Sequence, residues 1–297
     1  MSGLGLTFLR RGGQSHPTAG SDYIRFADAE VLRVLMANGV SSDGVGITKE
    51  DAAKVTSIGV WFRYNAVIKS FLEFAYFTKV KEIDATAFRT CTSLEEIKFP
   101  PSVESVGANA FMDCTALKSA DIANAYSLDS GSFRNCPLLN LNFSQTRLWL
   151  NSVTGGGIAR ESGIVKINAP LLEDMGSTDY TCHFQNCVQL VEVENLGKIT
   201  TIPGGNLNYS IFRGCTSLRK VRLPATLTNL GGYTFNQCYA LEVVICEAIN
   251  PPTSGAKPFN NTNDSFVIYV PTEAVDAYKS AANWNTYASQ IKPMSDI

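Results

Sequence analysis

The sequence predicts a mainly β protein with short helical segments, in which short coils stack into a solenoid that is capped at both ends. Three observations support this fold class. A Phe-x-x-Cys-x-x-Leu segment recurs six times, an apolar pair with a spacing of two follows most copies, and the two ends carry patterns of a different kind. Self-similarity with a period of about 20 to 50 residues is the signature of stacked repeat architectures.

The recurring segment sets the length of a coil. Its copies begin at Phe88, Phe111, Phe133, Phe184, Phe212 and Phe235. From one copy to the next, the cysteine position advances by 23, 22, 51, 28 and 23 residues. Because 51 is close to twice the period, we expect a degenerate coil inside this gap, with its strand at 164–170. The chain would then hold about seven or eight coils.

A short strand with one buried face is expected after each repeat leucine. Apolar residues two apart, such as Ile97 and Phe99, follow the leucine, and Leu141 and Phe143 form the same pair one residue early. Alternate side chains of a strand point to opposite faces. Stacking neighbouring coils at roughly 4.8 Å would therefore join the strands into one sheet over a continuous core.

Two of these coils resemble a known repeat family. The stretches LEEIKFPPSVESVGANAFMDC (94–114) and LRKVRLPATLTNLGGYTFNQC (218–238) resemble the BspA-like leucine-rich repeat family almost position for position. The resemblance covers about residues 60–297, because FVIYVPTEAVDAYKSAANWNTYA (266–288) is similar to the family's usual closing segment. It implies a leucine-rich-repeat solenoid in a bacterial or phage protein of Bacteroides-like type, concerned with adhesion and with binding a protein or a glycan. The motif specifies a fold and does not name a ligand.

Both ends are expected to be caps, because an open solenoid exposes a bare strand edge and core at each end. A helical pattern at 27–36 precedes a second helix that begins near Thr48, the predicted N-cap, with Asp51 three residues on. At the other end, a strand at 266–270 precedes an amphipathic helix at 272–281. We interpret this C-terminal segment as a hydrophobic lid; a separate binding module is the alternative.

Four segments follow from these patterns. Residues 1–22 are predicted to be a flexible or attachment tail, and residues 23–58 a helical N-terminal cap that resembles a decayed EF-hand. Residues 59–247 are predicted to form the leucine-rich-repeat solenoid, and residues 248–297 a strand–helix C-terminal cap.

Composition excludes several classes of partner. The chain has 25 Lys and Arg against 27 Asp and Glu, so the basic excess typical of nucleic-acid binding is missing. Apolar stretches are far shorter than a membrane-spanning helix requires, so membrane insertion is not expected. The apolar residues of segment 1–20 precede Arg10 and Arg11, which is the reverse of an export signal. A cell-surface, extracellular or virion-associated location is therefore expected from the family resemblance alone.

No catalytic residue, metal site or cofactor is predicted. The loop at 41–48 supplies too few carboxylates for calcium, so we interpret it as a structural relic. The repeat cysteines share one position and are expected to be buried thiols whose parallel directions do not suit disulfides. Cys182 and His183 are neighbours that would face opposite sides of a strand, and His16 lies in the predicted tail.

The outward side chains of the main sheet are the candidate ligand-binding residues. They are Glu96, Lys98, Asp121, Asn142, Lys166, Glu192, Glu194, Lys220 and Arg222. Parallel stacking should place the two glutamates of 192–194 beside Lys220 and Arg222, with Lys166 on the other side. Val243 and Ile245 would add an apolar patch at the end of this face. The alternative is that these charges only form cross-strand pairs on a solvated surface.

The predicted function is a non-enzymatic recognition or adhesion module whose partner is a protein or glycan on a surface. Variation of outward side chains at fixed positions lets a solenoid change its ligand without changing its fold. The alternative is a structural or receptor-binding component of a phage tail or surface appendage, with oligomers forming through the N-terminal tail.

Overall fold

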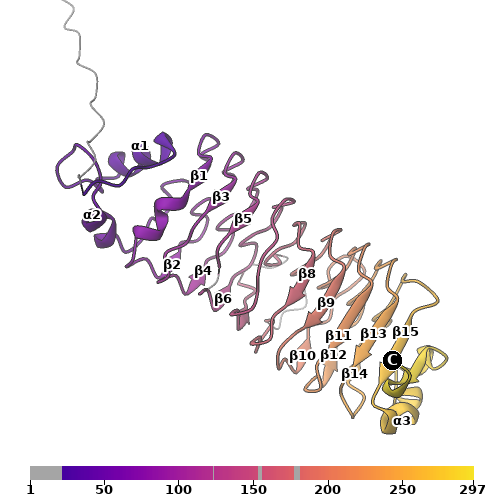
Figure 1. Ribbon diagram of the computed structural model, residues 1–297. Coiled ribbons are helices and arrows are strands. Elements are labelled where there is room, and N and C mark those ends of the chain that lie inside the picture. Colours follow the sequence, from indigo (N-terminus) through magenta and orange to yellow (C-terminus); the bar gives the residue numbers. More distant parts are fainter. Residues whose placement is uncertain (1–21, 123, 153–155, 177–180) are drawn as a thin grey trace, which may run out of the picture.

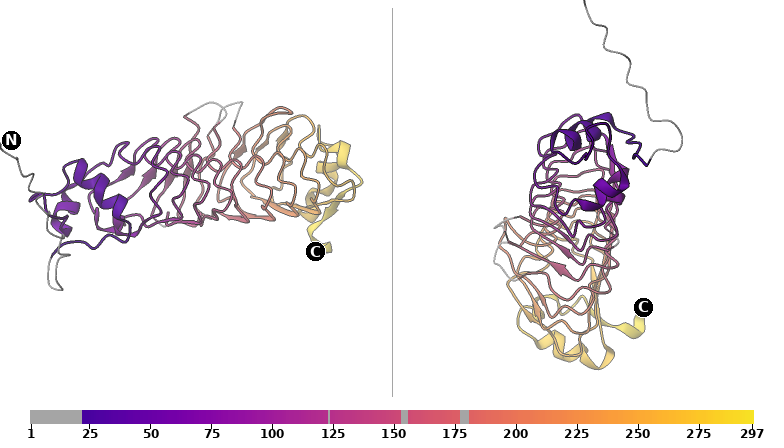
Figure 2. Two further views of the ribbon diagram at one scale, coloured as in Figure 1. Left: turned by 90° about the horizontal axis from the view of Figure 1, so that it is seen from above. Right: turned by 90° about the vertical axis from the view of Figure 1, so that its left-hand side faces the viewer.

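The computed structural model describes residues 22–122, 124–152, 156–176 and 181–297, and these form an elongated stack of coils (Figure 1). Helices lie at the two ends of the stack (Figure 2). The predicted fold class, a mainly β solenoid of leucine-rich-repeat type with terminal caps, is confirmed. Of the predicted tail at 1–22, residues 1–21 lie outside the described residues.

One row of parallel strands forms the main face of the rod. Its strands are β1 (Ser70–Phe71), β3 (Glu96–Ile97), β5 (Ser119–Ala120), β8 (Lys166–Asn168), β9 (Glu192–Asn195), β11 (Lys220–Leu223), β13 (Val243–Cys246), β15 (Val267–Val270) and β16 (Ile291–Pro293). They form a three-stranded sheet, β1-β3-β5, and a six-stranded sheet, β16-β15-β13-β11-β9-β8. The strand predicted in the degenerate coil is β8.

A second row of short strands lies along another side of the coils (Figure 1). Its strands are β2 (Glu82–Ile83), β4 (Ser105–Val106), β6 (Ser127–Leu128), β7 (Leu148–Trp149), β10 (Thr201–Ile202), β12 (Asn229–Leu230) and β14 (Thr253–Ser254). These also form two sheets, β2-β4-β6-β7 and β10-β12-β14. Each coil therefore runs through a main-row segment, a second-row segment and a Phe-x-x-Cys corner.

The expectation of one continuous main sheet is wrong, because the segment that contains Asn140 and Asn142 forms no main-row strand. Leu141 and Phe143 are buried, as predicted, but they come one residue early in the coil. If this segment paired in the same register as its neighbours, the shift of one residue would turn Leu141 and Phe143 away from the core. The segment keeps both side chains in the core and does not pair as a strand. The N–H of Val165 accordingly bonds to the Asn140 side-chain oxygen (3.3 Å), whereas the N–H of Val191 bonds to the backbone oxygen of Val165 (2.8 Å).

The Phe-x-x-Cys corners, by contrast, form an unbroken ladder. The residue just before the cysteine position has a positive φ in nine coils, at Tyr64, Thr90, Asp113, Asn135, Glu161, Asn186, Gly214, Gln237 and Asn261. The N–H of each of the first eight donates to the next coil, as from Tyr64 to Arg89 O at 2.8 Å and from Gln237 to Asn260 O at 3.1 Å. The described residues thus form nine coils rather than seven or eight, because Asn65 and Thr262 take the cysteine position in the first and last.

Phenylalanine rings and thiols stack along the core behind these corners. The rings of Phe62, Phe88, Phe111 and Phe133, and again those of Phe184, Phe212, Phe235 and Phe259, lie with centroids 5.0 to 5.8 Å apart and planes within 14°. Each of the six repeat thiols donates to the backbone oxygen of the aromatic position one coil earlier, at 3.0 to 3.2 Å. The prediction of buried, inward thiols is confirmed.

In the degenerate coil, other residues take the positions of the repeat phenylalanine and the repeat cysteine. Ala159 occupies the phenylalanine position, because the Cys187 thiol donates to its backbone oxygen, and Ser162 takes the cysteine position and donates to Phe133 O. The small Ala159 side chain leaves room that aromatic rings fill from elsewhere. Phe143 and Trp149 pack edge-on against Phe184, with centroids 5.7 and 5.1 Å away.

At the N-terminal end, the helical cap supplies the acceptor that a preceding coil would provide. Helix α1 (Ala29–Ala37) begins after Asp28, which accepts from the N–H of Glu30 at 2.9 Å. The second oxygen of the same carboxylate accepts from the N–H of Lys69 (2.6 Å) and of Ser70 (3.3 Å) at the edge of β1. One side chain therefore caps a helix and terminates the main row.

The second helix of this cap confirms the predicted start at Thr48. Helix α2 (Lys49–Lys54) has Thr48 as its N-cap, and Thr48 and Asp51 form a reciprocal capping box. The N–H of Ile24 donates to Ile47 O at 2.8 Å, which ties the entering chain to the loop between the helices. A 3-10 helix, η1 (Leu72–Tyr76), completes the N-terminal end.

At the C-terminal end, β15 is followed by η2 (Thr272–Ala274), α3 (Val275–Ser280), η3 (Asn285–Tyr287), β16 and η4 (Met294–Asp296). The Tyr278 hydroxyl donates to Ala248 O at 2.7 Å, and the Trp284 indole N–H donates to Pro252 O at 2.8 Å. Both rings are fully buried over the last coil. Phe259 stacks on Phe235, so coil stacking continues into the predicted cap, and the boundary at residue 248 stays a prediction.

We expect Phe212→Ala to lower the free energy of unfolding by about 3–5 kcal/mol, because Phe212 is fully buried between two stacked rings. Urea unfolding followed by circular dichroism measures this. Tyr239→Ala is the control, since that ring is 56% exposed in the next coil and its removal should change stability by less than about 0.5 kcal/mol. Equal losses in the two variants would contradict the stacked core.

We expect Asp28→Ala to cost about 2–3 kcal/mol, because it leaves two edge N–H groups and one helix N–H without their acceptor. Amide hydrogen exchange should rise at Lys69 and Ser70. Asp22→Ala, an exposed aspartate of the same end, is the matched control and should leave the exchange of both amides unchanged. Unchanged protection in Asp28→Ala would show that Asp28 does not terminate the sheet.

Candidate functional site

The central part of the predicted binding face assembles as a row of ion pairs. Glu192 lies in register with Lys166 on β8 and with Lys220 on β11. Its carboxylate lies 3.3 Å from Lys166 Nζ and 3.4 Å from Lys220 Nζ, and Glu194 lies 2.9 Å from Lys166 Nζ. The predicted position of Glu192 between Lys166 and Lys220 is confirmed.

Arg222 does not pair with Glu194 as the stacking argument suggested. Its guanidinium donates to Glu247, at the end of the next coil. The register between β8 and β9 shifts at Ile167/Asn168, and the β9–β11 register covers only Lys220↔Glu192 and Val221↔Val193. Glu194 therefore lies beyond the last residue pair between β9 and β11, and it is not in register with Arg222.

The remaining four candidates do not join this cluster. Glu96 and Lys98 lie at β3, and Asp121 follows β5, both in the separate three-stranded sheet. Asn142 lies in the segment without a strand between the two main-row sheets, where its side-chain oxygen accepts from the N–H of Ser144 at 3.0 Å. The nine predicted residues are thus exposed or half-buried on one side of the rod, but they form two groups.

The expected apolar end patch is not exposed. Ile245 is only 3% accessible and lies in register with Tyr269 of β15, so the C-terminal cap strand continues the sheet past it. Val243 is half-buried beside Val267. The sequence pattern did not predict that Ile245 is buried. Because β15 of the C-terminal cap pairs with β13, the strand of the last repeat lies inside the sheet and not at its edge.

The charges of the central cluster are mutually compensated. The partial burial of Glu192 acts to raise its pKa, but Lys166 and Lys220 outweigh it and hold the pKa below its ordinary value. Hydrogen bonds from Glu194 and Glu192 raise the pKa of Lys166. Both shifts favour the charged forms of Glu192 and Lys166, so a ligand at this face meets charges of both signs.

The buried thiols and His183 lie in environments that suppress their chemistry. Burial raises the pKa of the Cys187 thiol to about 12, and it also raises the pKa of Cys215 and Cys238. The thiolate is the reactive form, so these groups are structural. Among the described residues, no group of three or more His, Cys, Asp and Glu side chains could hold a metal ion.

His183 is a neutral core histidine. Its Nε2 lies 2.7 Å from Met175 O, and its Nδ1 accepts from the N–H of Ile158 at 3.4 Å, so Nε2 carries the proton. The ring is fully buried and packs 5.8 Å from Trp149. Burial lowers its pKa to about 4, against the opposing influence of Asp174 and Asp129.

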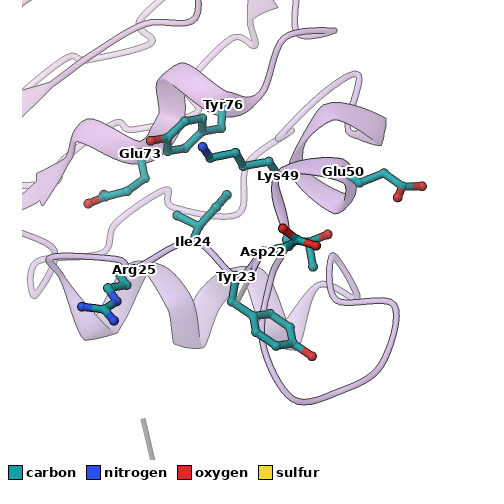
Figure 3. A pocket seen from close by; sticks show the side chains of 9 residues that line it. Asp22, Tyr23, Ile24, Arg25, Lys49, Glu50, Glu73 and Tyr76 are labelled. Atoms are coloured by element: carbon teal, nitrogen blue, oxygen red, sulfur yellow. The ribbon is translucent and has the colours of Figure 1, made fainter. Parts of the chain in front are cut away.

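A pocket of about 560 Å³ opens between the N-terminal cap and η1 (Figure 3). It is lined by Asp22, Tyr23, Ile24, Arg25, Thr48, Lys49, Glu50, Glu73 and Tyr76. Lys49 Nζ lies 4.9 Å from the centre of the Tyr76 ring, and Figure 3 shows the lysine reaching toward that ring. Glu73 accepts from the N–H of Ala27 at 3.0 Å. Charges of both signs line this pocket, and several of them are engaged within the cap.

The loop predicted to be an EF-hand relic uses its carboxylate internally. Asp43 accepts from the Tyr23 hydroxyl, from the N–H of Val45 (2.8 Å) and from Ser41 (3.1 Å). The Tyr23 hydroxyl is the first cause of the fall in the pKa of Asp43 to about 2. These bonds shape the loop around the carboxylate.

Sequence reasoning missed the arginines of the corners. The residue after the repeat phenylalanine is arginine at Arg89, Arg134 and Arg213, within the quoted motif itself, and the structure adds Arg63 and Arg160 at the equivalent positions of two other coils. The motif therefore held a signal, but only the register of the corners shows that these residues share a face.

We expect stability to fall as the pH falls from about 6.5 to about 4, because the unfolded chain takes up a proton at His183 before the folded chain does. Between pH 7.5 and pH 5 this should cost about 2 kcal/mol. Thermal unfolding of the wild type and of His183→Gln, which retains an amide donor, measures the difference. Parallel stability curves over this interval would contradict the assignment; above pH 7.5 the two slopes should agree.

Comparison with known proteins bears on the fold and the family. Residues 54–170 and 180–291 match the description "BspA type Leucine rich repeat region", in six copies. No curated protein matches the chain. In the described residues, no helix has the length and apolar character needed to cross a membrane.

Three solved structures resemble the chain. A leucine-rich repeat protein from Bacteroides ovatus shares 17% identity over 64% of this chain, with a TM-score of 0.42. A leucine-rich cell surface protein from Faecalibacterium prausnitzii shares 16% over 78%, and the pneumococcal vaccine antigen PcpA shares 16% over 73%, both with a TM-score of 0.30. The matches span 59%, 60% and 70% of those chains.

The family match covers most of the chain and includes every coil from Phe62 to Phe259. It coincides with the segments that carry the corner ladder and the stacked rings. The chain therefore belongs to the BspA-type leucine-rich repeat family.

Proposed function

We propose that the protein is a non-enzymatic recognition or adhesion module that binds a macromolecular partner along the surface of its solenoid. The observation that carries the proposal is the fixed register of outward side chains on a rod whose two ends are closed. Backbone bonds hold each coil to the next, so outward groups are presented as an ordered array with little freedom to lose on binding.

The family supports the general class of this function. Leucine-rich repeats of this type are interaction scaffolds, and one of the similar structures is described as a cell surface protein. We extend this to a protein or glycan partner and to a location outside the cell or on a virion. The buried, protonated thiols and the neutral core histidine fit a scaffold rather than a reaction centre.

Within this proposal, the six-stranded sheet is the preferred face. Lys166, Glu192, Glu194 and Lys220 form a compact cluster of both charge signs, with Arg222 beside it. Complementary charges contribute mainly to the specificity and rate of association, so this cluster favours a polar partner whose charges match the pattern. The separate group of Glu96, Lys98 and Asp121 extends the face toward the N-terminal end.

The appendage role differs in its use of the tail. It needs residues 1–20 to dock to a neighbouring subunit, and these lie outside the described residues. It therefore stays a prediction, and an oligomer formed through this tail is part of it.

Reversal of two charges tests the sheet face. We expect Lys220→Glu with Arg222→Glu to weaken binding at least tenfold, because it places two added carboxylates beside Glu192 and Glu247. Biolayer interferometry against a panel of immobilised extracellular proteins and glycans measures this, using panel members that the wild type binds saturably.

The matched control reverses Lys81 and Arg147, which each face one glutamate along the second row. It should bind as the wild type does. Unchanged affinity in the Lys220/Arg222 variant would remove the sheet face as the site. If no panel member bound saturably, the recognition function itself would be contradicted.

A further inference from the structure

We infer that the Phe-x-x-Cys corners form a second binding face, for a linear anionic polysaccharide. The face is built on an arginine row, defined as Arg63, Arg89, Arg134, Arg160 and Arg213. The inference rests on the proposed recognition function, but it assigns a different face and a specific class of ligand.

The corner ladder places these arginines in one line. Each follows the aromatic position of its coil, and the backbone oxygens of all but Arg63, which lies in the first coil, accept from the preceding coil. The Arg89, Arg134, Arg160 and Arg213 oxygens accept at 2.8 to 2.9 Å from the N–H groups of Tyr64, Asp113, Asn135 and Asn186. Coils in such a ladder are roughly 4.8 Å apart, so neighbouring arginines are about 5 or 10 Å apart along the rod. The main row of strands is interrupted between β5 and β8 and the second row between β7 and β10, whereas the corner bonds run without a break from Tyr64 to Gln237.

Few acidic groups oppose the row. At the adjacent positive-φ positions, only Asp113 and Glu161 carry carboxylates. Asp113 accepts from the Asn135 side chain at 2.9 Å. Glu161 lies 2.9 Å from Arg160 and 4.0 Å from Arg134, so one carboxylate is shared between two arginines. Five guanidinium groups against two carboxylates leave the face positive, although the whole chain is slightly acidic.

The guanidinium groups retain donors for a ligand. Arg63 donates to the Tyr64 hydroxyl at 2.7 Å and lies over its ring, and Arg213 Nε donates to Leu207 O at 2.7 Å. The Arg134 side chain is 31% exposed, and the Arg160 side chain, which pairs with Glu161, is 18% exposed. A guanidinium has five N–H donors, so an exposed group such as Arg63, with one donor engaged, can still form paired bonds to a carboxylate or sulfate.

The composition of the face favours a sugar chain over a protein. The positive-φ positions of the corner ladder carry mainly polar side chains, with amides at Asn135, Asn186, Gln237 and Asn261. Protein interfaces rely on a buried apolar or aromatic centre, whereas the exposed Tyr64 and Leu207 lie beside the first and last arginines of this line. The corner N–H groups are used in the ladder, so an added peptide strand has no free edge to join. An anionic polysaccharide needs only a line of charge-assisted and amide hydrogen bonds.

The test uses heparin and polygalacturonate as probes, with dextran as the neutral polymer and poly-L-glutamate as the acidic peptide. Biolayer interferometry with immobilised polymer should show saturable binding to at least one anionic polysaccharide that weakens with added NaCl, and none to dextran. Arg63→Gln with Arg134→Gln should weaken this binding about tenfold or more. Glu161→Gln, which removes the shared carboxylate, should strengthen it.

Lys118→Gln with Arg219→Gln is the matched control. It removes the same charge from exposed side chains beside the main row, each of which pairs with one glutamate, and it should change the affinity by less than about twofold. Circular dichroism establishes that each variant is folded. The opposite effects expected from Arg134→Gln and Glu161→Gln would not arise from a loss of structure.

Several results would overturn the inference. These are binding by the arginine variant as tight as that of the wild type, a loss no larger than in the control, and no binding to either polysaccharide. Equally tight binding to poly-L-glutamate would identify an acidic protein as the partner instead. Each result leaves the sheet-face experiment unaffected, because that experiment reverses Lys220 and Arg222 on the main row.

Discussion

The hydrogen-bonded corner between successive coils is the constraint on which this structure depends. In eight of the nine corners, the N–H of the residue with positive φ donates to the next coil. In six of the corners, the cysteine that follows this residue donates its thiol to the previous coil. The two bonds fix both the spacing and the rotation of neighbouring coils. Because the phenylalanine lies in the same turn, fixing the turn also stacks the rings. The strands add to this order without being needed in every coil.

The degenerate coil shows which part of the repeat is indispensable. It has lost both the phenylalanine and the cysteine, yet Glu161 keeps the positive φ and its N–H still reaches Gln185 O at 2.9 Å. Ser162 supplies the donor that a thiol supplies elsewhere, and Phe143 and Trp149 fill the volume beside Ala159. Backbone geometry is therefore retained where side-chain identity is not. Both rows of strands are interrupted in this region, whereas the corner ladder is not.

The ends of the rod satisfy the same bonding requirement by different means. At the first strand, a carboxylate replaces the missing carbonyl groups, and it belongs to a helix cap that the preceding chain folds into. At the last coils, Tyr278 and Trp284 donate to backbone oxygens and cover the apolar interior. Closed ends leave the sides of the rod as the surfaces for interaction. On these sides, the main face balances its charges within itself, whereas the corner face does not.

The sequence by itself determined the repeat, the inward position of the cysteines, the two caps and the neighbours of Glu192, because these follow from periodicity and parallel stacking. It also predicted Thr48 as a helix start, since an N-cap is a local signal. Only the tertiary structure decided that the main sheet breaks at Asn140, that Ile245 is covered and that Asp28 ends the sheet, because each depends on a contact between segments far apart in the chain. The arginine row also depends on the tertiary structure. The sequence shows that an arginine follows the repeat phenylalanine in several copies of the motif. Only the hydrogen bonds between successive corners align these arginines along one side of the rod.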